Sequence, residues 1–235
     1  MSAPTIVRKM QTTIFALLIL LTVFGSHQVK GQFLHPKIKS KEITIRRVVV
    51  LPAKVNVVRD SMKGPEGMAA ESDELSKRVE AMVDEVLAKK KRIATISTAA
   101  PAGEDDAQQK YNIADFQTKF DELLPKIMTK RSDVKKGRFS MGDEVLNLNV
   151  DKGVDAVVFI RGAGKKLTSG KTAFRLLVGG TPAYLMLQIG IVDARTGEVL
   201  LYTDPGLVGD PTTAVDRLRK ALEKGFKKLP EIKSQ

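Results

Sequence analysis

The chain of 235 residues contains no cysteine, no tryptophan and only two histidines. Without cysteine it can form no disulfide, no thiolate metal site and no thiol nucleophile, and it carries no cysteine to acylate. Both histidines, His27 and His35, lie near the N-terminus, outside the region expected to fold. A serine nucleophile with a histidine base and a histidine-ligated zinc site are therefore nearly excluded. The composition predicts no enzyme and no cofactor.

The remaining composition is that of a globular protein. Apolar residues make up 43% of the chain and charged residues 28%, which is enough apolar material for one core of ordinary size. The formal net charge is +12; residues 1–31 hold three cations and no acid, so the rest of the chain keeps +9. This surplus favours an anionic partner, such as an envelope surface, although a solvated basic surface explains it equally well.

The first 31 residues have the three parts of a secretory signal. Arg8 and Lys9 precede an apolar run over 14–24, and Val29 and Gly31 occupy the positions where a cleavage site needs small residues. Eleven helical residues rise only about 16 Å, roughly half of a bilayer core. We expect export to the periplasm or the outer membrane, with cleavage before Gln32. The alternative is an uncleaved inner-membrane anchor. Because the protein is expected to be exported, we expect no nucleic acid as a partner.

Several segments have the apolar patterns of strands, and a Gly-Pro-rich stretch over 52–71 reads as a loop. The predicted strands are 43–51, 93–97, 154–160, 172–178, 183–192 and 199–202. The sequence of 193–198, with Gly197 near its end, predicts a hairpin loop between the last two.

Four helices are predicted between and after these strands. Ser72 is expected to cap the first, Asn112 to cap the second with Pro125 as its limit, and Ser140 to open a short third. Asp210 is expected to cap the last, whose buried stripe is Val215, Leu218, Leu222, Phe226 and Leu229. Residues 99–110 are polar and predict a mobile surface loop.

The order of these elements predicts an α/β (α+β) fold with a mixed β-sheet of about five to six strands packed by three to four helices. Helices separate the early strands, which indicates a parallel part, and hairpins join the later ones. We expect a signal peptide over 1–31, a flexible segment over 32–42, a single domain over 43–229 and a tail over 230–235.

The segment from Gly164 to Thr172 resembles a phosphate-binding loop, because it contains Gly170-Lys171-Thr172 after a buried strand. Such a loop needs four residues between its glycines, and here there are five. The strand expected over 172–178 also replaces the helix that should face a phosphate. We therefore interpret the segment as a basic, flexible hairpin tip. Its cations, Lys165, Lys166, Lys171 and Arg175, are the candidate partner-binding residues.

Three segments together carry a resemblance to a known group of proteins. They are 47–52 (RVVVLP), 153–159 (GVDAVVF) and 191–200 (IVDARTGEVL). The set resembles the periplasmic α/β domain shared by the TolB amino-terminal domain, the curli-secretion lipoprotein CsgG and the penicillin-binding-protein activator LpoB. This resemblance covers most of 43–229 and implies a TolB-like fold and a non-enzymatic role in assembling or activating other envelope machinery.

The chain departs from this group in two respects. It lacks the cysteine that lipoproteins acylate, and its hairpin region over 162–182 is short and interrupted by cations and glycines, which puts channel formation in doubt. We expect a non-catalytic exported envelope protein that acts as an adaptor or assembly factor through contacts with envelope proteins. The alternative is a structural subunit of an oligomeric envelope ring or secretion complex, with copies of itself as partners.

Overall fold

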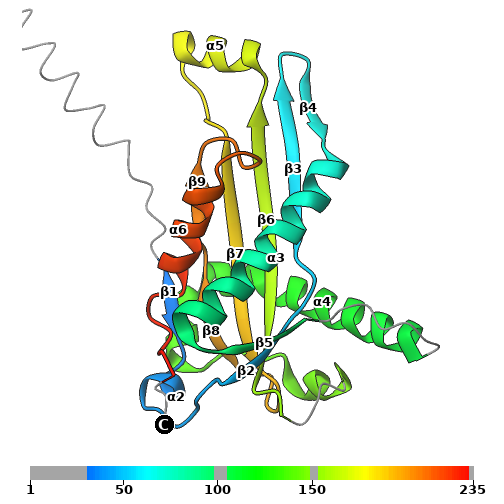
Figure 1. The fold of residues 1–235 in the computed structure, drawn as a ribbon, viewed down its shortest axis with the longest axis vertical. Helices are drawn as coiled ribbons and strands as arrows, with labels where there is room; N and C mark the ends of the chain where they lie inside the picture. Colours follow the sequence, from blue (N-terminus) through cyan, green and yellow to red (C-terminus); the bar gives the residue numbers. More distant parts are fainter. Residues whose placement is uncertain (1–30, 98–104, 149–152, 233–235) are drawn as a thin grey trace, which may run out of the picture.

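The computed structural model describes residues 31–97, 105–148 and 153–232. In these residues the chain forms one nine-stranded mixed sheet with helices on both faces (Figure 1). The expected mixed α/β class is confirmed, with more strands than expected. The strands are β1 (Gln32–Leu34), β2 (Arg47–Val50), β3 (Lys54–Ser61), β4 (Gly64–Gly67), β5 (Ala94–Ser97), β6 (Ala156–Leu167), β7 (Tyr184–Asp193), β8 (Val199–Thr203) and β9 (Gly206–Val208).

Two long antiparallel strands, β6 and β7, run through the centre of the sheet, whose order is β1-β8-β7-β6-β2-β5. The early strands β2, β3 and β5 join parallel ladders, and the later ones are antiparallel. Strand β2 pairs with the first part of β6, and β3 pairs with its second part, from Arg161 onward. Strand β9 likewise pairs with the start of β7. Beyond Arg161 the sheet continues as β4, β3, β6, β7 and β9 (Figure 1).

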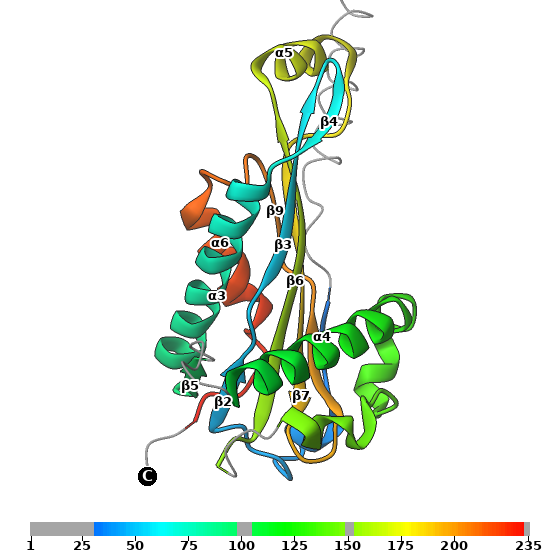
Figure 2. The ribbon, with the colours of Figure 1, turned by 90° about the vertical axis from the view of Figure 1, so that its right-hand side faces the viewer.

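Helices cover the two faces of the sheet unequally. Figure 2 shows α3 and α6 along one face, and α4 across the lower part of the other. The helices are α2 (Pro36–Lys39), α3 (Ala69–Lys91), α4 (Asp105–Thr129), α5 (Ser169–Val178) and α6 (Val215–Gly225), with the 3-10 helices η1 (Arg131–Lys136) and η2 (Gly142–Leu148). No helix among the described residues has the length and apolar character that a membrane crossing requires.

Successive side chains of β6 point to opposite faces of the sheet, so the core has two layers. Val158 and Ile160 pack toward α3 and α6, whereas Val157 and Phe159 pack toward α4. The second layer ends at Arg161, whose guanidinium is buried and forms an ion pair with Asp121 of α4. Beyond Arg161 no helix in the described part of the chain covers that face of the sheet, so its upper half is open.

The segment 32–42 was expected to be flexible and is instead structured. Strand β1 pairs antiparallel with β8, and α2 follows with His35 as its N-terminal cap. Leu34 and Ile38 are buried in the core layer of α3 and α6. Two buried apolar side chains and the hydrogen bonds to β8 hold this segment in place. Its apolar pattern is short and interrupted by a proline, so the sequence did not predict this.

The loop predicted over 52–71 is wrong, because this stretch forms the β3–β4 hairpin. Lys54, Val55, Asn56 and Val57 alternate between exposed and buried, which is the pattern of a half-buried strand. The glycines and proline of 64–67 serve as the short edge strand β4, which has few side chains to pack.

Several predicted helix boundaries are also wrong. Helix α3 begins before Ser72, whose hydroxyl instead binds the β3 backbone N–H of Val57 at 2.9 Å. Helix α4 begins at Asp105, so part of the predicted loop over 99–110 is helical, while 98–104 lie outside the described residues. Helix α4 also continues past Pro125 to Thr129. A Ser, Asn or Asp side chain can form hydrogen bonds with several different backbone groups. The tertiary structure determines which of these bonds it makes.

At the C-terminal end, Asp210 closes a turn with Thr212 and α6 begins only at Val215, which is exposed. The remaining stripe of Leu218, Leu222, Phe226 and Leu229 is buried as predicted.

Candidate docking surface at the tip of the sheet

One end of the molecule consists of the β3–β4 hairpin, the last residues of β6, helix α5 and the start of β7 (Figures 1 and 2). Helix α5 replaces the strand predicted over 172–178, and that prediction is wrong. Thr168 caps the helix by accepting a hydrogen bond from the backbone N–H of Lys171 at 3.3 Å. A short apolar run fits a strand or a helix equally well by composition, and the cap decides for the helix.

Helix α5 is amphipathic, but its apolar side faces solvent. None of its residues is buried. The exposed fractions are 47% for Phe174, 79% for Leu176, 84% for Leu177 and 63% for Val178. A surface helix normally turns this side toward the core. A cluster of large exposed aliphatic side chains marks a surface that a partner covers.

The two cations of α5 make contacts within the chain. The ammonium group of Lys171 lies 3.5 Å from the Asp60 carboxylate on β3. The Arg175 Nε donates to the carbonyl of Gly180 at 3.0 Å. The Lys171–Asp60 ion pair joins the helix to β3, and the Arg175–Gly180 bond joins it to the residues that follow, while the apolar side chains stay exposed.

The structure brings the four predicted partner-binding cations to this tip and gives each an internal partner. Lys165 lies 3.5 Å from Asp60 and 5.8 Å from the centre of the Tyr184 ring. Lys166 lies 3.5 Å from Asp210. Burial acts to raise the pKa of Asp210, but hydrogen bonds from Thr212 and the charge of Lys166 lower it overall. The charges are thus partly neutralised within the chain, and the interpretation of this segment as a flexible hairpin tip is wrong.

The open half of the sheet continues the apolar surface below α5. Val58, Met186 and Val208 are exposed on β3, β7 and β9. Where α4 begins to cover this face, a groove of about 560 Å³ lies between the helix and the sheet, lined by Asn56, Met128, Ala163 and Gln188 among others.

Two arguments were made against a phosphate-binding loop over 164–172, and the structure bears on both. Gly170 lies in the first turn of α5, so a helix stands where a strand was expected and that argument fails. The spacing argument stands. In addition, the hydroxyl of Thr168 already binds the N-terminus of α5, and Lys171 is paired with Asp60.

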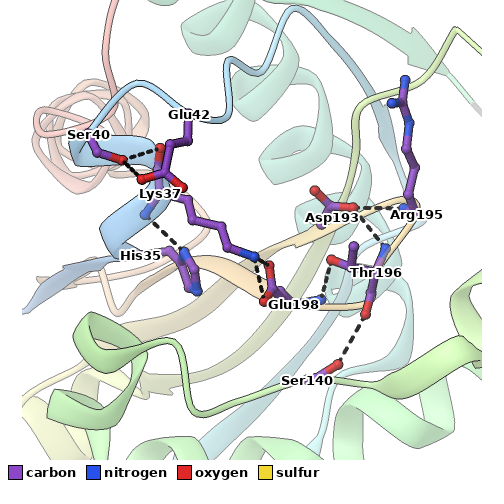
Figure 3. A network of polar contacts seen from close by, with 9 residues as sticks. All are labelled: His35, Lys37, Ser40, Glu42, Ser140, Asp193, Arg195, Thr196 and Glu198. Atoms are coloured by element: carbon purple, nitrogen blue, oxygen red, sulfur yellow. Dashed lines mark hydrogen bonds and ion pairs between the residues drawn. The ribbon is translucent and has the colours of Figure 1, made fainter.

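The described residues contain no group of three or more His, Asp or Glu side chains placed to hold a metal ion. His35, expected to lie in a flexible segment, is 3% exposed. Burial lowers its pKa and its Nδ1 accepts from the N–H of Lys37, whereas its Nε2 is buried beside Gly137 without a hydrogen-bond partner among the described residues. The Lys37 ammonium lies 2.7 Å from the Glu198 carboxylate, and the Ser140 hydroxyl donates to the Thr196 carbonyl. Figure 3 shows both contacts. The Lys37–Glu198 pair ties α2 to the β7–β8 hairpin, and the Ser140 bond ties the segment before η2 to the same hairpin, which is a structural role.

No family model matches the sequence, and no curated protein matches it. Solved structures are distantly similar. A PelC dodecamer from Paraburkholderia phytofirmans is 10% identical, with a TM-score of 0.38 over 80% of this chain and 89% of that one. Lipoprotein GNA1162 from Neisseria meningitidis is 12% identical, with a TM-score of 0.35 over 77% and 96%. The LpoB C-terminal domain from Salmonella enterica is 12% identical, with a TM-score of 0.27 over 73% and 93%.

These scores are too low to identify a family or a function. LpoB belongs to the group that the sequence resembles, and the resemblance to TolB and CsgG stays a prediction.

Sequence reasoning selected the cations of this region and missed Phe174, Leu176, Leu177 and Val178. One signal for them was present. Lys171 and Arg175 are four residues apart, as expected for one side of a helix, and Leu176 and Leu177 do not share that spacing with either cation.

Proposed function

We propose that this protein is a non-catalytic adaptor or assembly factor of the cell envelope, and that it docks a partner protein on the tip formed by α5. The observation that carries the proposal is the outward apolar side of this helix. The signal-like segment 1–31 supports export, and the internal engagement of His35 supports a role without histidine-based catalysis.

The exposed side chains of α5 are sufficient to drive docking. Full burial of one Leu, Val or Phe side chain contributes about 1.5–3 kcal/mol. With the exposed fractions of Phe174, Leu176, Leu177 and Val178, covering all four contributes about 4–8 kcal/mol, from which the cost of association is subtracted. This contribution suits a contact that adds to a wider interface on the open sheet face.

The position of the cations favours a protein over a lipid surface. A helix that lies in a membrane interface keeps Lys and Arg on its polar side, free to meet anionic headgroups. In α5, Lys171 binds Asp60 of β3 and Arg175 binds the carbonyl of Gly180 just beyond the helix, so both cations are engaged within the chain. A partner protein with an apolar groove could cover the exposed side of α5 while the contacts of Lys171 and Arg175 stay in place.

The test compares two variants of the same helix in the full chain, produced in its native host. Leu177→Asp places a charge on the apolar side, and Thr172→Asp places one on the polar side near the helix start, where an acid is tolerated. Native size analysis of the envelope fraction should find the wild type and Thr172→Asp in a complex. Leu177→Asp should run as the free chain.

Two outcomes oppose the proposal. Wild-type protein that already runs as a free chain overturns it, and so does an equal distribution of the two variants. A complex built only from copies of this chain supports the alternative of a ring subunit, which a mass close to a multiple of one chain identifies.

A further inference from the structure

A second site lies at the opposite end of the sheet from α5. There the segment after α2, the end of α3 and the C-terminal tail come together at the base of the molecule (Figure 1). They enclose a cavity of about 520 Å³, which falls in the size range of small-molecule sites.

The inner surface of this cavity is aliphatic. Ile38, Ile45, Ile93 and Leu229 are buried and line it. Ile43 and Ile232 pack at its sides and are partly buried. A branched aliphatic lining of this kind accepts an alkyl chain.

The polar residues at the cavity are mostly basic. Lys41, Arg46 and Arg92 line it, and Glu231 is the one acid among the lining residues. Arg92 lies 3.2 Å from Glu231, with both side chains about half exposed. Among the described residues that line the cavity, three cations and one carboxylate give a surplus of two positive charges beside an apolar interior.

Two of these cations occupy backbone conformations that favour glycine. Lys41 has φ 66° and Arg92 has φ 56°, and they are the two non-glycine residues with positive φ in the described part of the chain. Arg92 closes α3 through its N–H to Ala88 and the Ile93 N–H to Leu87, a helix end at which glycine is usual. Lys41 follows α2, with its N–H bonded to Ile38.

Both strained residues are basic and both line the same cavity, although 51 positions separate them in the sequence. Backbone strain of this kind concentrates at sites where a side chain is needed for function. Glycine would fold more easily at either position, but it would remove a cation from the cavity.

We propose that this cavity binds an anionic amphiphile, a single alkyl chain that carries a carboxylate or phosphate head. The chain lies among the isoleucines, and Lys41, Arg46 and Arg92 bind the head. Lys233, Ser234 and Gln235, which follow Ile232 in the sequence, are polar and do not match the aliphatic lining.

The test uses the purified full chain and titration calorimetry below the micelle concentration of each probe. The probes are dodecanoate, dodecyl phosphate and dodecyltrimethylammonium, which share one chain length. One anionic molecule should bind per protein, and the cationic probe should bind at least tenfold more weakly. The stronger of the two anions identifies the head group.

Arg92→Gly gives a signature that a purely structural role would not produce. It should weaken anion binding at least tenfold and raise the melting temperature by about 2–4 °C, because glycine relieves the positive φ. Arg92→Lys retains charge and strain and should bind within threefold of the wild type.

Three results would overturn the proposal. Equal binding of anionic and cationic probes indicates unspecific apolar contact. Unchanged binding by Arg92→Gly removes the role of the strained cation. Binding that is seen only after deletion of residues 233–235 makes the end of the chain itself the occupant.

Discussion

The orientation of α5 predicts opposite outcomes for two leucines in two amphipathic helices. Leu177 of α5 is 84% exposed, whereas Leu222 of α6 is fully buried between the helix and the sheet. Replacing each by alanine removes the same atoms. The free energy of unfolding should fall by about 2–5 kcal/mol for Leu222→Ala, because a cavity remains in the core. For Leu177→Ala it should change by less than about 0.5 kcal/mol.

The contrast is large against the total stability of a domain, which is about 5–15 kcal/mol. Urea unfolding of the full chain, followed by circular dichroism, measures both changes. Lys220→Ala on the exposed side of α6 serves as the control and should leave the midpoint unchanged. A loss of more than about 1.5 kcal/mol for Leu177→Ala would refute the outward orientation of α5, and the docking surface with it.

Three further outcomes are expected. Burial lowers the pKa of His35 from its ordinary value of 6.5, so the unfolded chain binds a proton before the folded one and stability is lost as the pH falls below 6.5. His35→Asn keeps a cap for α2, and its urea midpoint should fall less than that of the wild type between pH 7 and 5. Gly197→Ala should destabilise by more than about 1 kcal/mol, because φ is 68° and the new Cβ would lie 2.3 Å from the Gly142 carbonyl oxygen, whereas Gly170→Ala meets no atom within 4 Å and should not destabilise. The exported protein should have the intact mass of a chain that begins at Gln32. A full-length product embedded in the membrane would instead favour the uncleaved anchor.

The sequence alone determined those elements whose pattern is local. The apolar runs that became β6 and β7 were found, because a strand buried on both faces needs apolar side chains at nearly every position. The hairpin between β7 and β8 was found from Asp193 and Gly197, which bind and turn the backbone within a few residues. The stripe of Leu218, Leu222 and Phe226 was found because a helix packed on a sheet repeats its apolar side every three to four residues.

Tertiary structure decided the features on which the proposals rest. Periodicity reveals that a helix has an apolar side, but other segments decide whether that side is covered. In α5, Asp60 of β3 binds Lys171, and the apolar side chains stay exposed. Lys41 and Arg92 line the same cavity because β2 and β5, which follow them in the chain, pair with each other. No local sequence pattern predicts this pairing. Burial depends on which distant segments meet, and it is therefore the property of this chain that only the folded structure determines.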